Sequence, residues 1–406
     1  MNKLSNKIIK LFCIRFNQIA VPLLIYPYTI SVVGLESFGV ISFWLGLSAF
    51  FAKIISLNMD SFSLRVVSRS LGNKYELKKS IIMPLFIKGC ISLFFIPIYI
   101  LFALNYASSN EQFVVALFCL YPIFQAVFNF NHYFVATGKF NIWIFISFFS
   151  NVFLLLGIFI LVNKPEDYTI YPIVYFFSVL LPIPVIFKVM RLNYFKFNFS
   201  ILLRSSREYI SVSKWLVSGK LLQLHMNAAK PIIGFLFGYT AVAIYDVSEK
   251  IVNISKIPFS IISDSLFSEQ MKKGHAFLRV SFISIFISLL IYSLLYLFGE
   301  YALLYLLGNQ YTIESFAILK ILSLILFITP LSLLFGVNFV VKFAEQTLYG
   351  KFLLSSSVIS VAVLGLLFFT CDFGLKIFSF WVVFCEFILF FHCFVYFIKE
   401  QHVKSL

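Results

Sequence analysis

Polar side chains recur at helical spacing between residues 220 and 230, within a largely apolar stretch. At about 100° of rotation per residue, they share an arc of about 80° on one helix face. They are Lys220, Gln223, Asn227 and Lys230, and neither lysine has an acidic neighbour in the local sequence. Ammonium groups attract anions, while amides donate and accept hydrogen bonds as sugar hydroxyls require. We therefore predict that this face binds an anionic, hydroxyl-rich ligand.

A second polar face follows between residues 246 and 264, and it contains carboxylates as well as lysines. Its arc is about 120° wide, and its members are Asp246, Glu249, Lys250, Asn253, Lys256, Ser260 and Asp264. Burial and a neighbouring cation shift a carboxyl pKa in opposite directions, so a group balanced between them can exchange a proton. The predicted ion-coupling candidates are Glu249, Asp246 and Asp264, with H+ or Na+ as the coupling ion. Glu249 is the first choice because its spacing from Lys256 allows a change of partner.

Two further segments carry polar groups inside apolar stretches. Gln125, Asn129 and His132 share an arc of about 60°, and Arg15 and Gln18 share a face of the first apolar stretch. Ionisable groups within a bilayer face a cavity or a partner instead of lipid. The predicted substrate-binding residues are Arg15, Gln18, Lys53, Gln125, Asn129, Lys220, Gln223, Asn227, Lys230 and Lys250.

These polar faces have a structural alternative, in which interhelical hydrogen bonds and internal ion pairs hold the helices together. Asp246 or Glu249 would then pair with Lys250. Lys88 and Lys320 lie near the ends of apolar stretches, where a lysine side chain can extend to the membrane surface. Such an extension explains both lysines without a binding role.

Sequence motifs of several enzyme classes are missing. The chain has no GxxxxGK[ST], HExxH or GxSxG pattern, which are the signatures of nucleotide hydrolysis, zinc proteolysis and serine hydrolysis. Its six cysteines include no CxxC pair, so they indicate neither a disulfide framework nor a zinc site. We expect no catalytic residue, no metal site and no organic cofactor.

The elements that carry these polar faces must cross a membrane. Hydrophobic residues make up 61% of the 406 residues and charged residues 12%, against about 45–50% and about 25% in soluble domains. Since about 20 apolar residues cross a bilayer as a helix, we predict an all-α polytopic membrane protein with about twelve transmembrane helices. The estimated spans are 8–32, 38–58, 80–105, 113–135, 141–162, 168–189, 213–237, 241–264, 278–298, 313–336, 352–370 and 377–398.

The net charge of +15 reflects membrane orientation and does not indicate nucleic-acid binding. Basic residues gather in alternate loops, and the opposite loops hold only Lys164 and Lys376. The positive-inside rule therefore predicts cytoplasmic N- and C-termini. The basic linker 196–212 separates a predicted N-terminal six-helix bundle, 1–195, from a C-terminal one, 213–406.

The two halves share a short pattern. GLESFG at 34–39 follows the first span and GYTAVA at 238–243 follows the seventh, each with a small residue five positions after its first glycine. The match falls at equivalent places in the two halves, which indicates an internal repeat.

In these features the chain resembles the bacterial O-antigen repeat-unit flippases, in the polysaccharide-transport branch of the multidrug/oligosaccharidyl-lipid/polysaccharide exporter superfamily. The resemblance covers essentially the full length. It is carried by Asn17-Gln18 with PLLIYPY at 22–28, by GLESFG at 34–39, and by residues 238–251, which end in DVSEKI. The chain departs from its relatives at 266–268, where LFS stands in place of a Leu-Phe-Pro segment. The resemblance therefore does not predict how the chain bends at this end of the eighth span.

The resemblance implies two six-helix bundles around a central cavity. It further implies that undecaprenyl-pyrophosphate-linked O-antigen oligosaccharides are flipped from the cytoplasmic to the periplasmic leaflet of the bacterial inner membrane, for lipopolysaccharide biosynthesis. Cations at matching positions, Arg15, Lys220, Lys230 and Lys250, would receive the anionic substrate. The implied partners are the lipid-linked oligosaccharide, membrane lipids, and the O-antigen polymerase with its chain-length machinery, without nucleic acid.

Three other functions remain open at this point. An exporter of another lipid-linked glycan (capsule, teichoic or lipid II) would differ mainly in cargo. A cation-coupled drug antiporter of the same fold would centre on membrane carboxylates in the first half, whose predicted spans contain none. A membrane glycosyltransferase or polymerase would need catalytic residues on a sizeable outer loop, yet the longest one, 299–312, has a single carboxylate, Glu300.

Overall fold

The computed structural model describes residues 21, 23–56, 59, 63, 66–68, 70–190, 206, 228–259, 274–340, 346–370 and 372–405. These residues are almost entirely helical and include no strand, which confirms the predicted all-α class. They form two compact units, one within residues 9–217 and the other within residues 218–406. We call them the N-terminal unit and the C-terminal unit.

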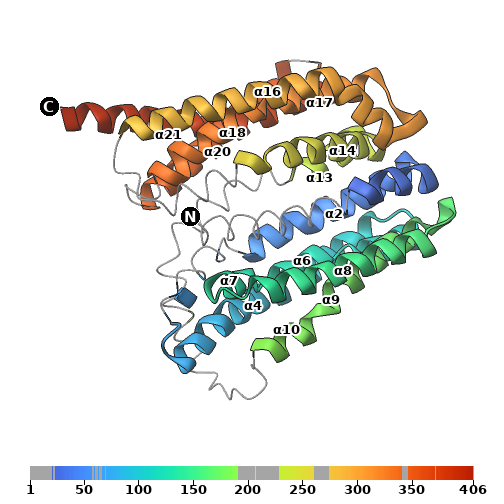
Figure 1. Cartoon of the computed structure of the whole chain (residues 1–406). Coiled ribbons are helices and arrows are strands. Elements are labelled where there is room, and N and C mark those ends of the chain that lie inside the picture. The colour runs from blue at the N-terminus through green and yellow to red at the C-terminus, as the bar shows by residue number, and fades with distance from the viewer. Residues whose placement is uncertain are drawn as a thin grey trace. The chain divides into compact units, whose positions relative to one another are not determined.

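The N-terminal unit begins, in its described part, with the helix Leu23–Val33. Its labelled helices are α2 (Leu35–Ser56), α4 (Lys74–Tyr106), α5 (Asn110–Phe118), α6 (Tyr121–Val127), α7 (Asn131–Ala136), α8 (Phe140–Leu161), α9 (Ile170–Leu180) and α10 (Pro182–Met190). Helix α2 packs against α4, α5 and α6, while α8 packs against α9 (Figure 1).

Helix α2 supplies much of the core of this unit. Trp44 is fully buried and its ring meets those of Tyr99 and Phe102 on α4, with centroids 6.1 Å away in both cases. The Tyr99 hydroxyl donates a 2.9 Å hydrogen bond to the Ala116 carbonyl of α5. A buried hydroxyl must find an acceptor, so this bond fixes the register of α4 against α5.

Helices α8 and α9 approach each other closely at Gly157. A Cβ atom at this position would lie 2.6 Å from Cγ1 of Val174 on α9. We expect Gly157→Ala to lower the free energy of unfolding by about 1–3 kcal/mol, as overpacking of a core does. Unfolding of the purified protein in detergent micelles measures the change.

Gly89→Ala is the matched control, because a Cβ atom at Gly89 in α4 would meet no heavy atom within 4 Å. This variant should keep or slightly raise the stability, since alanine favours a helix over glycine by about 0.5–1 kcal/mol. Equal effects at the two glycines would contradict the close approach of α8 and α9.

The C-terminal unit contains a short hairpin followed by longer helices. They are α13 (Ala229–Phe237), α14 (Tyr239–Ser255), α16 (Gly274–Leu307), α17 (Ile313–Ser323), α18 (Ile325–Ser332), a π-helical stretch (Leu333–Val340), α20 (Gln346–Thr370) and α21 (Leu375–Ser405). Helix α14 packs against α13 and α17, and α21 packs against α17, α18 and α20.

Prolines mark the interruptions within three of the predicted spans. Pro122 lies in the first turn of α6, Pro182 begins α10, and Pro330 precedes the π-helical stretch. Proline lacks a backbone donor and clashes with the carbonyl four residues earlier, which ends or distorts an α-helix. These three spans are built from consecutive shorter helices, whereas α4 stays continuous through Pro84 and Pro97.

Gly34 and Gly238 both have a positive φ, of 85° and 82°. Gly34 joins the helix Leu23–Val33 to α2, and Gly238 joins α13 to α14. A positive φ costs glycine little because it lacks a Cβ atom. The two glycines that mark the sequence repeat thus make equivalent turns in the two units, which supports the repeat.

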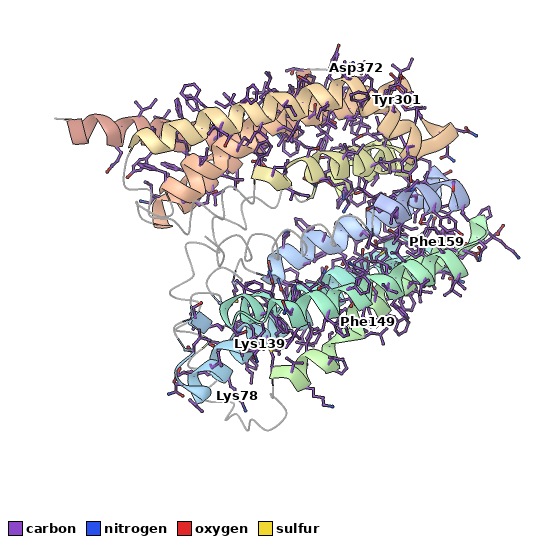
Figure 2. The ribbon with its side chains drawn as sticks, viewed as in Figure 1. Lys78, Lys139, Phe149, Phe159, Tyr301 and Asp372 are labelled. Atoms are coloured by element: carbon purple, nitrogen blue, oxygen red, sulfur yellow. The ribbon has the colours of Figure 1, made fainter. Side chains whose placement is uncertain are left out.

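The described helices confirm a multi-pass membrane protein. A helix lies at each predicted span, and within the described part nine are long and apolar enough to cross a membrane. Figure 2 shows Phe149 and Phe159 along α8 and Tyr301 on α16. These side chains are 57%, 43% and 69% exposed, as expected for aromatic rings that face lipid.

Candidate functional site

The tight turn at Gly238 brings Lys230 of α13 against the polar face of α14. Lys230 lies eight residues before this glycine and Asp246 eight residues after it. At 1.5 Å of rise per residue, both lie about 12 Å from the turn along adjacent helices. Glu249 lies three residues beyond Asp246, on the same face of α14. This spacing places one ammonium group opposite two carboxylates.

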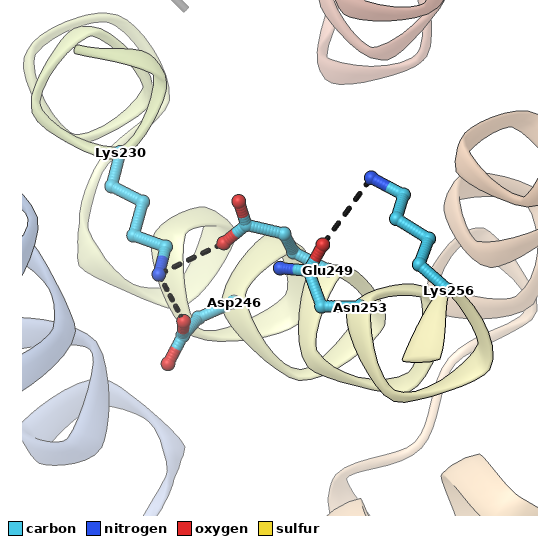
Figure 3. A network of polar contacts seen from close by, with 5 residues as sticks. All are labelled: Lys230, Asp246, Glu249, Asn253 and Lys256. Carbon is cyan, nitrogen blue, oxygen red and sulfur yellow. Dashed lines mark hydrogen bonds and ion pairs between the residues drawn. The ribbon is translucent and has the colours of Figure 1, made fainter. Parts of the chain in front are cut away.

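Lys230 forms ion pairs with both of these carboxylates (Figure 3). Its Nζ contacts Oδ1 of Asp246 and lies 2.9 Å from Oε2 of Glu249. The side chain of Asp246 is 4% exposed and that of Glu249 is 35% exposed. We call Lys230, Asp246 and Glu249 the ion cluster. One of its carboxylates is buried, and the other is accessible.

The two ion pairs differ in the free energy that breaking them costs. A buried carboxylate that loses its cation is left as an uncompensated charge, which costs about 3–5 kcal/mol. A partly exposed carboxylate can exchange its partner for water or for another ion at much lower cost. The geometry therefore favours a permanent bond between Lys230 and Asp246 and an exchangeable one between Lys230 and Glu249.

Lys230 has no acidic neighbour in the local sequence, but the structure gives it two acidic partners from the next helix. Its partners are 16 and 19 residues away along the chain, beyond the three- or four-residue spacing at which side chains meet on one helix. The turn at Gly238 supplies the contact. Lys256, the predicted alternative partner of Glu249, donates a 3.3 Å hydrogen bond to Oδ1 of Asn253, the next residue along the same face.

Six of the predicted site residues lie outside the described residues. They are Arg15, Gln18, Lys220, Gln223, Asn227 and Asp264. Their predicted roles remain predictions.

The other predicted residues are spread over both units. Gln125 is exposed on α6, and Lys53 is exposed in the last turn of α2, where a cation interacts favourably with the helix dipole. Asn129 accepts a 3.1 Å hydrogen bond from the backbone N–H of Asn131, so it shapes the turn between α6 and α7. Lys250 is half-buried on α14, beside the ion cluster in sequence.

Lys88 is an interior residue that the sequence reasoning missed. It was expected to extend to the membrane surface, but it is 1% exposed, inside the N-terminal unit. The expected start of this span at residue 80 was too late, because α4 begins at Lys74 and places Lys88 about 21 Å along the helix. Asn73 accepts hydrogen bonds from the backbone N–H groups of Tyr75 and Glu76. A capping asparagine followed three residues later by Glu76 was the signal for this earlier start.

Among the described residues, His, Cys, Asp and Glu side chains do not form a group of three or more that could hold a metal ion. The candidate site in the described part of the chain is therefore the ion cluster.

Solved structures of transporters share this fold. The inward-facing conformation of a multidrug resistance MATE family transporter of the MOP superfamily matches with a TM-score of 0.71 and 14% identity, over 95% of this chain and 96% of that one. A MOP superfamily transporter from Pyrococcus furiosus, for which reverse polarity of the binding pocket suggests a different function, matches with a TM-score of 0.66 and 14% identity, over 98% and 94%. At such identities the likeness establishes the fold.

Sequence comparison identifies the family. No curated protein sequence matches the chain. A family model described as polysaccharide biosynthesis protein matches residues 5–267, well over half of the chain. The chain belongs to the polysaccharide biosynthesis protein family and has the fold of the MOP superfamily transporters.

Proposed function

We propose that this protein flips undecaprenyl-pyrophosphate-linked O-antigen oligosaccharides from the cytoplasmic to the periplasmic leaflet of a bacterial inner membrane. The family and the transporter fold support export of a glycan. The observation that carries the proposal is the ion cluster, in which Lys230 bridges a buried carboxylate and an accessible one. Because Glu249 is accessible, an anionic substrate can replace it on Lys230. The displaced carboxylate can then bind the coupling ion.

The pyrophosphate competes with Glu249 for the ammonium group of Lys230. Phosphate oxygens accept charge-assisted hydrogen bonds from lysine, and the Glu249 side chain is exposed enough to move away. Asp246 stays bound and holds the ammonium in place. Lys220 and Lys250 of the C-terminal unit add positive charge for the same anion, while the amides of Gln223 and Asn227 serve the sugar hydroxyls. For the N-terminal unit, Arg15, Gln18, Lys53, Gln125 and Asn129 stay predicted substrate contacts.

The displaced Glu249 carboxylate then couples substrate binding to an ion gradient. Without Lys230, this carboxylate binds a proton or a sodium ion to balance its charge. When the substrate leaves in the opposite leaflet, Lys230 recaptures Glu249 and the ion is released on that same side. The ion therefore moves with the substrate, and only a gradient that falls in the direction of transport stimulates translocation. Differential binding of this kind biases an alternating-access equilibrium. Asp264 is a second carboxylate for the same exchange.

A cationic drug is a poorer fit to this cluster than an anion. Asp246 and Glu249 already share the ammonium group of Lys230. A drug cation would have to displace this ammonium group, which is covalently attached to the protein. We therefore place lipid-linked glycan export ahead of drug antiport. Capsule, teichoic and lipid II carriers share the pyrophosphate or phosphate chemistry and are distinguished by direct comparison of cargo.

Translocation of a labelled undecaprenyl-pyrophosphate oligosaccharide in liposomes tests the proposal. Arg15→Gln and Lys220→Gln should each reduce the initial rate about tenfold or more, because a charge-assisted contact to a bound anion contributes about 1.5–3 kcal/mol. Surface polysaccharide of the corresponding cells should fall while the amount of inserted protein is unchanged.

Lys376→Gln is the matched control, since Lys376 is an exposed lysine in the first turn of α21 and has no predicted contact with substrate. Its rate should equal that of the wild type. Wild-type rates in both the Arg15 and the Lys220 variants, or faster movement of an organic cation than of the lipid-linked glycan, would refute the proposal.

A further inference from the structure

Lys320 lies in a membrane-spanning helix with aromatic rings as its neighbours instead of a carboxylate. Its Nζ atom lies 4.1 Å from the ring centroid of Phe316 on α17 and 4.4 Å from that of Tyr296 on α16. Within the described part of the chain, this ammonium makes no ion pair and no hydrogen bond. Ring faces attract a cation but leave its three N–H donors without acceptors.

The ammonium group of Lys320 points toward the end of the span. Phe316 is one turn nearer the start of α17 and only three residues, about 5 Å, from its first residue, Ile313. A cation over this ring is therefore displaced toward the connection between α16 and α17. Lysine side chains in spans commonly extend in this way to the level of the lipid headgroups.

Close packing of α16 on α17 places the rings of Phe316 and Tyr296 around the ammonium group of Lys320. We call these two rings the aromatic seat. A Cβ atom at Gly299 would lie 3.0 Å from Cδ2 of Leu319 and 3.4 Å from Cε2 of Phe316. The glycine thus lets α17 approach one turn away from Tyr296, so that the Phe316 and Tyr296 rings can hold one ammonium group between two helices. The position of Lys320 is fixed by packing and is not that of a freely moving surface lysine.

An apolar groove begins at the same aromatic ring. It has a volume of about 430 Å³ and is lined by Tyr292, Ser293, Tyr296 and Leu297 of α16. Tyr296 and Leu297 are 53% and 63% exposed. From Tyr296 to Tyr292 the groove runs about 6 Å away from the α16–α17 connection, toward the middle of the bilayer. This is the direction in which an acyl chain descends from its headgroup.

We propose that Lys320 and this groove bind one anionic phospholipid of the bilayer. The acidic headgroup accepts hydrogen bonds from the ammonium group of Lys320, and one acyl chain occupies the groove below it. Charge complementarity selects the lipid, because a zwitterionic headgroup brings a cation of its own close to Lys320. The site uses residues of the C-terminal unit only and does not depend on the identity of the transported substrate.

Native mass spectrometry of the full-length protein, released from nanodiscs of equal parts phosphatidylglycerol and phosphatidylcholine, tests the site. The wild type should retain one phosphatidylglycerol in preference to phosphatidylcholine. Lys320→Gln should lower this preference about tenfold, whereas Lys320→Arg should keep it, since a guanidinium group also binds phosphate and stacks on aromatic rings. Lys351→Gln, which removes an exposed lysine from α20, is the charge-matched control and should behave as the wild type.

A second variant separates the groove from the charge. Ser293→Trp fills the groove and retains Lys320, so it should weaken retention of long-chain phosphatidylglycerol more than that of a dibutanoyl analogue. An unchanged lipid preference in Lys320→Gln would overturn the proposal, as would an equal loss in Lys351→Gln. Competition by free glycerol 1-phosphate as strong as that by phosphatidylglycerol would show that the anion, and not a lipid, is the ligand.

Discussion

Lys230→Met is expected to lower the free energy of unfolding by about 3–5 kcal/mol. The substitution removes the cation that Asp246 and Glu249 share, so the buried carboxylate of Asp246 loses this ion pair. Breaking one side of a buried ion pair has this large cost because the remaining charge keeps its desolvation penalty. Denaturant unfolding of the purified protein in micelles measures it, with the yield of inserted protein as a second readout.

Removal of the charge imbalance should reverse most of this loss. In Lys230→Met combined with Asp246→Asn and Glu249→Gln, no charge of the ion cluster remains, and neutral replacements of buried ion pairs are often tolerated. The triple variant should therefore be more stable than Lys230→Met alone and inactive in translocation. If it were as unstable as the single variant, Lys230 would act through packing and not through its ion pairs.

Glu249→Gln should abolish the stimulation of translocation by an ion gradient while it retains substrate binding. The amide has the shape of the carboxylate but cannot exchange a proton or neutralise a sodium ion. Asp246 still holds Lys230, so the anion-binding ammonium group stays in place. Initial rates in liposomes with and without an imposed gradient measure the effect, and binding of the lipid-linked glycan to the purified variant checks the retained affinity.

Glu386→Gln is the control for this experiment. Glu386 is another half-buried carboxylate within a predicted span, on α21 of the same unit, and its replacement should leave gradient stimulation intact. If Glu249→Gln responded to the gradient as the wild type does, Glu249 would not be the coupling group. Translocation of the glycan would then have to be coupled through another carboxylate, for which Asp264 and Asp246 are the remaining candidates.

The sequence predicted the fold class well because composition alone decides it. A chain with 61% hydrophobic and 12% charged residues has few alternatives to a helical bundle in a bilayer. The helical periodicity of residues 246–256 also placed Asp246 and Glu249 on one face, and their shared contact with Lys230 confirms that geometry. Both inferences rest on local properties of the chain.

Contacts between helices were not predictable in the same way. The partner of Lys230 depends on the backbone conformation of Gly238, and the burial of Lys88 depends on where α4 begins. The aromatic seat of Lys320 depends on how closely α16 and α17 pack at Gly299. Periodicity identifies the face on which a residue lies, whereas the neighbouring helix determines what that residue touches.

The hairpin of α13 and α14 has a consequence for biogenesis. A lone lysine or aspartate at the centre of an inserting helix costs about 2.5–3.5 kcal/mol. Because Lys230 and Asp246 lie at matching distances from the turn at Gly238, the two helices can neutralise each other before the rest of the chain has been synthesised. The hairpin, and not the single helix, is then the unit that partitions into the bilayer during translation.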